Sequence, residues 1–331
     1  MINPAMWGKA LIRMPRVSSE EWRGLDVIAR WLVITRAAVL TMTLLPCLLM
    51  GELALRQHAF DLELWAVVTL GLLAAHATNN LVNDLTDHLK GTDGGDYFRT
   101  QYGLQPLEQG VLTMKQFAVY AVLTGGVALA CGGWLLYTRA GLVLPLFGAG
   151  IFFVLFYTYP LKYYGFGELA VILVWGPLMV GGGYYVVTGA WSWPVAIAGA
   201  VYALGPTQVI FGKHIDKLEA DAIKKIKTLP VVLGEKRSRQ GVVLMMVVQY
   251  ALLVYLVVTG FFVWPVLCVF LSLGTFYKLT RVYGRPRPTT MPKCWREDIW
   301  PLWFSAWSFL HNARFGVLLI AGVAVDLLLH R

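Results

Sequence analysis

Four aspartates and three asparagines occur within residues 79–96, directly after a long apolar run. Asn80, Asp84 and Asp87 follow one another at helical spacing, as do Asn83 and Asp87, so these side chains share a face at a helix end. Carboxylates at a helix C-terminus are repelled by the negative end of the helix dipole. A divalent cation would offset the repulsion, and Asp and Asn oxygens are ligands suited to Mg²⁺. We therefore interpret this first acidic cluster as a metal–phosphate site; the simpler alternative is a solvated helix end.

A second acidic cluster occupies residues 213–230 and also follows an apolar run. Acid and base alternate in it, which makes a salt-bridged surface helix a fair alternative interpretation. Its position matches that of the first cluster, on the same predicted side of a membrane, and this favours a functional role. The chemistry-bearing residues here are Lys213, His214, Asp216, Lys217, Glu219, Asp221, Lys224, Lys225 and Lys227.

Two acidic clusters flanked by cations suit the ionisation of an allylic diphosphate. Metal ions would bridge the diphosphate to both clusters and stabilise its charge as it leaves. Lysine and arginine side chains would hold the departing phosphates. Aromatic side chains on the surrounding helices would stabilise the remaining carbocation by cation–π attraction. The clusters thus predict a reaction that starts by breaking a carbon–oxygen bond.

The elements that position these clusters are apolar runs long enough to cross a membrane. The 331 residues are 57% hydrophobic and 14% charged, whereas a soluble domain has roughly 25% charged residues. A spanning helix needs about 20 apolar residues. We predict an all-α fold, a polytopic transmembrane bundle of about nine helices, with the seventh-to-eighth boundary the least defined. The spans are Trp31–Met50, Leu62–Leu85, Phe117–Leu136, Leu142–Tyr159, Glu168–Val187, Trp193–Phe211, Val242–Phe261, Val263–Leu279 and Phe309–Leu329.

Basic residues set the predicted orientation, because they are concentrated in cytoplasmic loops. With the N-terminus inside, the outer segments hold only Arg56, Arg139 and Arg331. We therefore expect residues 1–30 to form a cytoplasmic arm, residues 31–331 to form the transmembrane domain, and both acidic clusters to face the cytoplasm. The localisation expected is the cell (inner) membrane. The net charge of +9 is spread over membrane-flanking loops, which excludes a nucleic-acid partner.

At these residues, over about Arg36–Gly316, the chain resembles the UbiA superfamily of intramembrane prenyltransferases. The segment Asn83-Asp84-Leu-Thr-Asp87-His-Leu-Lys-Gly91-Thr-Asp93 is similar to the form in the 1,4-dihydroxy-2-naphthoate polyprenyltransferases, the menaquinone branch. In that branch the third aspartate comes two residues after a glycine. Thr35-Arg36 resembles the family's first helix and Tyr157–Lys162 its Tyr/Lys loop; in the family, this arginine and this lysine contact diphosphate.

Further segments agree with the same branch. They are Gly167-Glu168, Trp175-Gly176-Pro177 and Tyr184–Gly189, and His311–Gly316 resembles the start of the family's last helix. The resemblance therefore covers most of the chain.

The second motif departs from the family pattern, which is usually Asp-x-x-x-Asp. Alignment on Thr228-Leu229-Pro230 places Asp221 on the last aspartate and Glu219 on the glutamate often found there, but it places Lys217 on the first aspartate, one residue after Asp216. A shift of one residue turns a helical side chain by about 100°. Either the helix is rewound so that Asp216 serves, or the second metal site differs.

The resemblance implies an Mg²⁺-dependent prenyltransferase. It would move a prenyl chain from a polyprenyl diphosphate to a small, aromatic acceptor resembling 1,4-dihydroxy-2-naphthoate, within membrane lipid. One metal would be bound by Asn83, Asp84, Asp87 and Asp93, and the other by Asp216, Glu219 and Asp221. The diphosphate would be bound by Arg36, Lys162, Lys213 and Lys225. The catalytic residues expected are Asp87, Asp221 and His214, the last taking a proton from the acceptor.

Three alternatives stay open at this point. An enzyme of the same family would act on another acceptor, such as 4-hydroxybenzoate, a glycerol-phosphate lipid or another small molecule. A polytopic transporter with charged mouths predicts ionisable residues deep inside helices, yet the helix centres are almost free of Asp and Glu. A phosphotransferase of the CDP-alcohol kind would carry a longer aspartate signature, which is absent.

Overall fold

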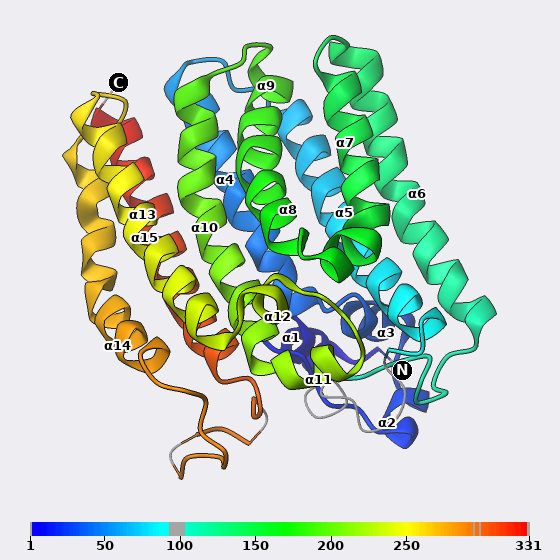
Figure 1. Ribbon diagram of the computed structural model, residues 1–331. Coiled ribbons are helices and arrows are strands. Elements are labelled where there is room, and N and C mark those ends of the chain that lie inside the picture. The colour runs from blue at the N-terminus through cyan, green and yellow to red at the C-terminus, as the bar shows by residue number, and fades with distance from the viewer. Residues whose placement is uncertain (1, 93–102, 294, 298, 330–331) are drawn as a thin grey trace.

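The computed structural model describes residues 2–92, 103–293, 295–297 and 299–329, and this part of the chain is helical and contains no strand. Within it, nine helices are long and apolar enough to cross a membrane, which confirms the predicted fold class (Figure 1). The spans are Ala37–Arg56, which contains α4 (Thr41–Arg56); α5 (Leu62–Leu89); α6 (Met114–Arg139); Val143–Tyr164, which contains α7 (Val143–Phe156); Gly167–Thr188, which contains α8 (Gly167–Leu173) and α9 (Gly183–Thr188); α10 (Trp193–Asp216); α13 (Glu235–Val258); Trp264–Tyr283, which contains α14 (Leu273–Tyr283); and α15 (Phe304–Leu329).

The remaining helices are short and lie at one end of the bundle, where the N-terminus is also found (Figure 1). We call this the polar end, because α5 and α10 both finish there with their acidic clusters. Successive spans alternate in direction, so the C-terminus lies at the opposite end. The short helices are α1 (Pro4–Ile12), α2 (Ser19–Arg23), α3 (Val27–Ile34), α11 (Leu218–Ile223) and α12 (Leu229–Leu233).

The helix α10 is the centre of the bundle. In its most apolar stretch 83% of α10 is buried, against 17% for α6 and 11% for the span that contains α7. A helix that is apolar all round yet exposed needs an apolar solvent, so α6 and α7 have the surface of helices that face lipid. At Gly199 the backbone of α10 lies so near the α8–α9 helix that a Cβ atom would be 2.8 Å from the Gly176 carbonyl oxygen.

The first span differs from the prediction. The apolar run from Trp31 to Met50 was expected to be one helix, but α3 ends at Ile34 and the membrane span starts at Ala37. Arg36 separates them in the left-handed region, with φ of 56°. One left-handed residue breaks a helix without changing the hydrophobicity of the run, so the pattern gave no sign of it.

The ends of the other spans moved by up to seven residues, the largest shift being the start of α13 at Glu235. The seventh and eighth spans are separate, as predicted, with the break between Val258 and Trp264. The last helix begins at Phe304, five residues before its predicted start. Its first turn is capped by a side chain from α10, described below, and this tertiary contact extends the helix beyond its apolar run.

The N-terminal arm is folded against the polar end. Trp22 and Leu25 are buried in a cluster with Leu112 and Phe117. Asp26 caps α3 through the Ala29 amide and also accepts hydrogen bonds from the backbone of Asn3 and the Trp7 indole. Trp22 and Leu25 thus fix the arm to the loop before α6 and to α6 itself. The predicted boundary at residue 30 and the cytoplasmic placement of the arm stay predictions.

We expect Gly199→Ala to destabilise the protein by about 1–3 kcal/mol, because the added methyl group overpacks the contact between α10 and the α8–α9 helix. Gly241→Ala, on α13, is the matched control: a Cβ there meets nothing within 4 Å, and alanine is the better helix former. Thermal unfolding of the purified protein in detergent measures both. Equal midpoints for the two variants would contradict the tight packing at α10.

Candidate active site

A cavity of about 1020 Å³ enters the bundle from the polar end. Along α5 it is lined from Asp87 to Val68, a depth of about 28 Å at the helical rise. That is close to the hydrocarbon thickness of a bilayer, about 30 Å. Its far end is apolar and is formed by Leu135, Val143 and Val186. The polar end is lined by Arg36, Asn80, Asn83, Asp87, Lys162, Lys213, His214 and Lys217.

Several segments outside the spans line the mouth of this cavity, and Gly103 and Leu104 before α6 form one of them. Residues 12–15 come from the arm, and Trp295, Ile299 and Leu302 come from the loop before α15. The Arg16 guanidinium donates to the Glu297 and Trp300 carbonyls across the mouth. The arm and the loop before α15 therefore both cover the polar end of the cavity.

Three oxygens of the first acidic cluster converge on a single cation. Lys162 Nζ lies 3.1 Å from Asn83 Oδ1 and 2.9 Å from each carboxylate oxygen of Asp87. Thr158 also donates to Asn83, and Tyr163 Oη donates to Asp87 Oδ1 at 3.1 Å. Lys162 and Asp87 are both buried, and a buried charge needs such a complete set of partners.

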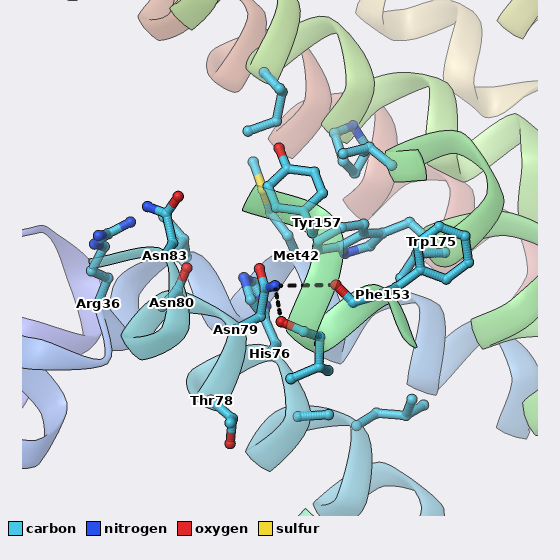
Figure 2. Close-up of a pocket in the computed structure, with 18 of the residues that line it drawn as sticks. Arg36, Met42, His76, Thr78, Asn79, Asn80, Asn83, Phe153, Tyr157 and Trp175 are labelled. Atoms are coloured by element: carbon cyan, nitrogen blue, oxygen red, sulfur yellow. Dashed lines mark hydrogen bonds between the residues drawn. The ribbon is translucent and has the colours of Figure 1, made fainter. Parts of the chain in front are cut away.

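The turn after α7 brings Lys162 over the end of α5. The α-helix ends at Phe156, and a π-helical turn over Tyr157–Leu161 contains Pro160. Asn79 Nδ2 donates to the Phe153 and Val154 carbonyls near this turn, at 3.4 and 3.0 Å (Figure 2). The Asn79 side chain thus ties α5 to the last turn of α7, where the Phe153 carbonyl also accepts from the Tyr157 amide.

Asp84 is paired with Arg36. The guanidinium Nη2 donates to Asp84 Oδ1, and Asn80 Nδ2 donates to the Thr35 carbonyl at 2.9 Å. Both bonds hold the left-handed break after α3 against α5. Arg36 lines the cavity and lies beside Asn80 and Asn83 (Figure 2). The ion pair between Arg36 and Asp84 was not predicted, and the contact of Arg36 with diphosphate stays a prediction.

In the second cluster, Asp216 is engaged elsewhere. Its two carboxylate oxygens accept from the Phe304 and Ser305 amides, at 2.9 and 3.0 Å, so it caps α15. Gly212 permits the close approach, since a Cβ there would be 2.8 Å from Ser305 N. Helix α10 runs regularly to Asp216, so the rewound helix considered for this position does not occur. This geometry argues against a metal role for Asp216.

Lys217, in the place of the family's first aspartate, lines the cavity and is buried. Its Nζ lies 3.0 Å from Asp221 Oδ1, the i,i+4 spacing that favours ion pairs on a helix. Lys213 also lines the cavity, one turn earlier. Glu219 and Lys225 are exposed and do not line it, and Asp93 lies outside the described residues.

His214 lines the cavity, and its Nδ1 is 2.5 Å from Glu168 Oε1. Glu168 was not among the predicted site residues. Its signals in the sequence were its place as a single acid at the start of an otherwise apolar helix and the resemblance of Gly167-Glu168 to the family. Tyr163 and Thr158 were missed as well, because their roles depend on how the turn after α7 folds back over α5.

The donor set at the polar end fits a divalent cation. Among the described residues no three His, Cys, Asp or Glu side chains form a metal cluster. However, the Asn83 and Asp87 oxygens already surround one cationic atom, the Lys162 ammonium. Mg²⁺ is typically held by one or two carboxylates together with substrate phosphates. The same residues offer cations for those phosphates, so the site can hold metal and phosphate together.

Comparison with known proteins gives the following matches. The profile of the UbiA prenyltransferase family matches residues 44–309. The chain is 26% identical over 239 residues to the 2-carboxy-1,4-naphthoquinone phytyltransferase of Synechocystis sp., covering 70% of this chain and 75% of that protein. It is 29% identical over 226 residues to the 1,4-dihydroxy-2-naphthoate octaprenyltransferase of Escherichia coli, covering 63% and 70%.

Two solved structures share the fold. A UbiA homologue from Aeropyrum pernix in the apo state aligns with a TM-score of 0.62 and 17% identity, over 86% of this chain and 97% of that one. A UbiA homologue from Archaeoglobus fulgidus bound to GPP and Mg²⁺ aligns with a TM-score of 0.51 and 16% identity, over 85% and 97%.

We expect Asp216→Ala to lower stability by about 1–2 kcal/mol, because the first turn of α15 loses the side chain that accepts from two of its amides. Glu219→Ala removes an exposed carboxylate three residues on and should leave the thermal midpoint unchanged. Thermal unfolding of both variants in detergent is the measurement. An unchanged midpoint for Asp216→Ala would mean that the cap contributes nothing.

Proposed function

Because the chain belongs to the UbiA prenyltransferase family and is a prenyltransferase, we propose that its donor is a polyprenyl diphosphate and its acceptor a small hydroxylated aromatic acid of the 1,4-dihydroxy-2-naphthoate type. The relatives' names support this acceptor class. The homologue bound to GPP and Mg²⁺ supports the donor and the metal. We further propose that the polar end faces the cytoplasm, because the basic residues gather there.

The observation that carries this proposal is the shape and polarity of the cavity. Its polar end presents Arg36, Lys162, Lys213 and Lys217, and its apolar length continues to Val68 and Leu135. An anionic head followed by a long apolar tail is the chemistry of a polyprenyl diphosphate. The depth of about 28 Å along α5, from the helical rise, places such a tail at the level of the lipid chains.

We propose that Asn83 and Asp87 hold one Mg²⁺, with Asp84 and Asp93 as further predicted ligands, and that Asp221 contributes to a second site. When bound, the metal would neutralise charge that develops on the diphosphate. Asp216 faces α15 and Glu219 is exposed, so we assign neither to the metal. The cations for the phosphates are Arg36, Lys162, Lys213 and, in the place of the family's aspartate, Lys217.

The protein's own groups then account for the reaction. The bond between the allylic carbon and the diphosphate oxygen breaks, and the oxygen keeps the electron pair while lysine and arginine side chains stabilise it. Trp175 and Tyr157 line the adjacent cavity (Figure 2) and stabilise the allylic cation by cation–π attraction. A ring carbon of the acceptor donates an electron pair to that cation and forms the new carbon–carbon bond.

The direct experiment is a product assay. Purified protein in nanodiscs receives geranylgeranyl or longer prenyl diphosphates, Mg²⁺, and one of three acceptors: 1,4-dihydroxy-2-naphthoate, 4-hydroxybenzoate or a glycerol-phosphate lipid. We expect diphosphate release together with a prenylated naphthalene product, detected by mass spectrometry. If product forms only with one of the other two compounds, that compound is the acceptor and our assignment is wrong. If no combination releases diphosphate, the proposed function is refuted.

A second prediction concerns the metal. Asp87→Asn should raise the Mg²⁺ concentration needed for half-maximal activity and lower the rate on the order of 10²-fold, because one anionic ligand is lost where charge develops. Asp216→Asn is the control and should keep the wild-type Mg²⁺ requirement. Size-exclusion chromatography of both variants is the check that they fold. A shift for Asp216→Asn as large as for Asp87→Asn would place Asp216 at the metal instead.

A further inference from the structure

One buried acid–histidine pair lies beside the cavity and is not among the residues that we assign to metal or diphosphate. Glu168 lies in the first turn of α8, and His214 lies in the last turn of α10. Glu168 Oε1 is 2.5 Å from His214 Nδ1, and the two side chains are 1% and 3% exposed. The pair joins residues 46 positions apart, and both are inside the protein at the polar end of the bundle.

The two members of the pair face different surroundings. His214 lines the cavity and Glu168 does not. Because Nδ1 is held by Glu168, Nε2 is the nitrogen left for a ligand in the cavity. The other Glu168 oxygen, Oε2, is buried without a hydrogen-bond partner among the described residues. Among the described residues, the hydrogen bond that the Glu168 carboxylate makes is therefore the one to His214.

This arrangement is the one that makes an imidazole a base. A carboxylate on Nδ1 keeps the proton on that nitrogen, orients the ring and leaves the Nε2 lone pair available. It also stabilises the imidazolium that forms when Nε2 takes a proton. Burial strengthens the interaction, since the local dielectric is low.

The position of His214 also fits an acceptor. It lines the same cavity end as Asn83, Asp87 and Lys162, where the allylic carbon–oxygen bond would break. Lys213 and Lys217 lie one residue before it and three residues after it on the chain, and both line the cavity. A hydroxylated acceptor would thus meet a base at the cavity end where the phosphate-binding lysines also lie.

We propose that Glu168 is a positioning residue that makes His214 the general base for the acceptor, an assignment that rests on the proposed function. Nε2 takes the proton of a ring hydroxyl, and the oxygen's electrons move into the ring as the ring carbon bonds to the allylic cation. The group on that carbon then leaves without its bonding electrons, either as carbon dioxide or as a proton that passes to water, and the ring regains its aromaticity with a negatively charged oxygen. That oxygen takes back the proton from the imidazolium, which returns His214 to its neutral form.

The competing explanation is that the pair is a structural tie between α8 and α10. Such a tie would matter for folding, and its loss would reduce all activities alike. The two explanations differ in how the loss depends on the acceptor's acidity, because a general base matters less when the acceptor ionises easily.

The test compares variants over a series of acceptors whose ring hydroxyls differ in acidity. His214→Ala should lower kcat by about 10²- to 10⁴-fold for the least acidic acceptor. The decrease in kcat should be smaller for the more acidic acceptors, and the KM for the prenyl diphosphate should stay nearly unchanged. Added imidazole should restore part of the rate. Glu168→Gln should cost about 10- to 100-fold, and Glu168→Asp should recover most of that loss.

The matched control is His311→Ala on α15. His311 is also buried, binds Tyr250 Oη at 3.1 Å and does not line the cavity. Any loss it causes should be the same for every acceptor and insensitive to imidazole. If His214→Ala shows that same uniform, unrescued loss, or if Glu168→Gln behaves as wild type, the proposal is overturned. Failure of the proposed function is distinct, because then the unaltered protein forms no product.

Discussion

An ionised side chain buried within a membrane protein needs an opposite charge beside it, and this constraint determines the arrangement of the polar end. Asp84 meets Arg36, Asp87 meets Lys162, and Asp221 meets Lys217. Two of these pairs join distant elements. The break at Arg36 and the turn after α7 both place a cation over the end of α5. The irregular backbone at these two points therefore brings each cation to the carboxylate that it neutralises.

The same pairs suit the charged substrate that we propose. A diphosphate with its metal brings both signs of charge, so the lysines can turn to phosphate while the carboxylates turn to the metal. Such an exchange leaves few buried charges without a partner at any stage. The second cluster differs from the pattern expected for the family. Lys217 places a cation where an aspartate was expected, and Asp216 caps α15.

The sequence predicted the spans well, because hydrophobicity is a local property, whereas the metal role of the first cluster stays a prediction. It predicted neither the break at Arg36, which changes no hydrophobicity, nor the part that Asp216 plays, which depends on α15, 88 residues further along the chain. The Glu168–His214 pair likewise joins two helices that only the fold brings together. Spacing alone could have suggested the Lys217–Asp221 ion pair, which is an i,i+4 contact.

The central claim is that the polar end binds prenyl diphosphate through metal and lysine together. Calorimetric titration of the protein in nanodiscs with geranylgeranyl thiolodiphosphate, an analogue that ionises poorly, tests it without any acceptor. The account predicts saturable binding with Mg²⁺, much weaker binding with a chelator, and weaker binding for Lys162→Met even with Mg²⁺. Equal affinity with and without the metal, unaffected by the loss of Lys162, would contradict it.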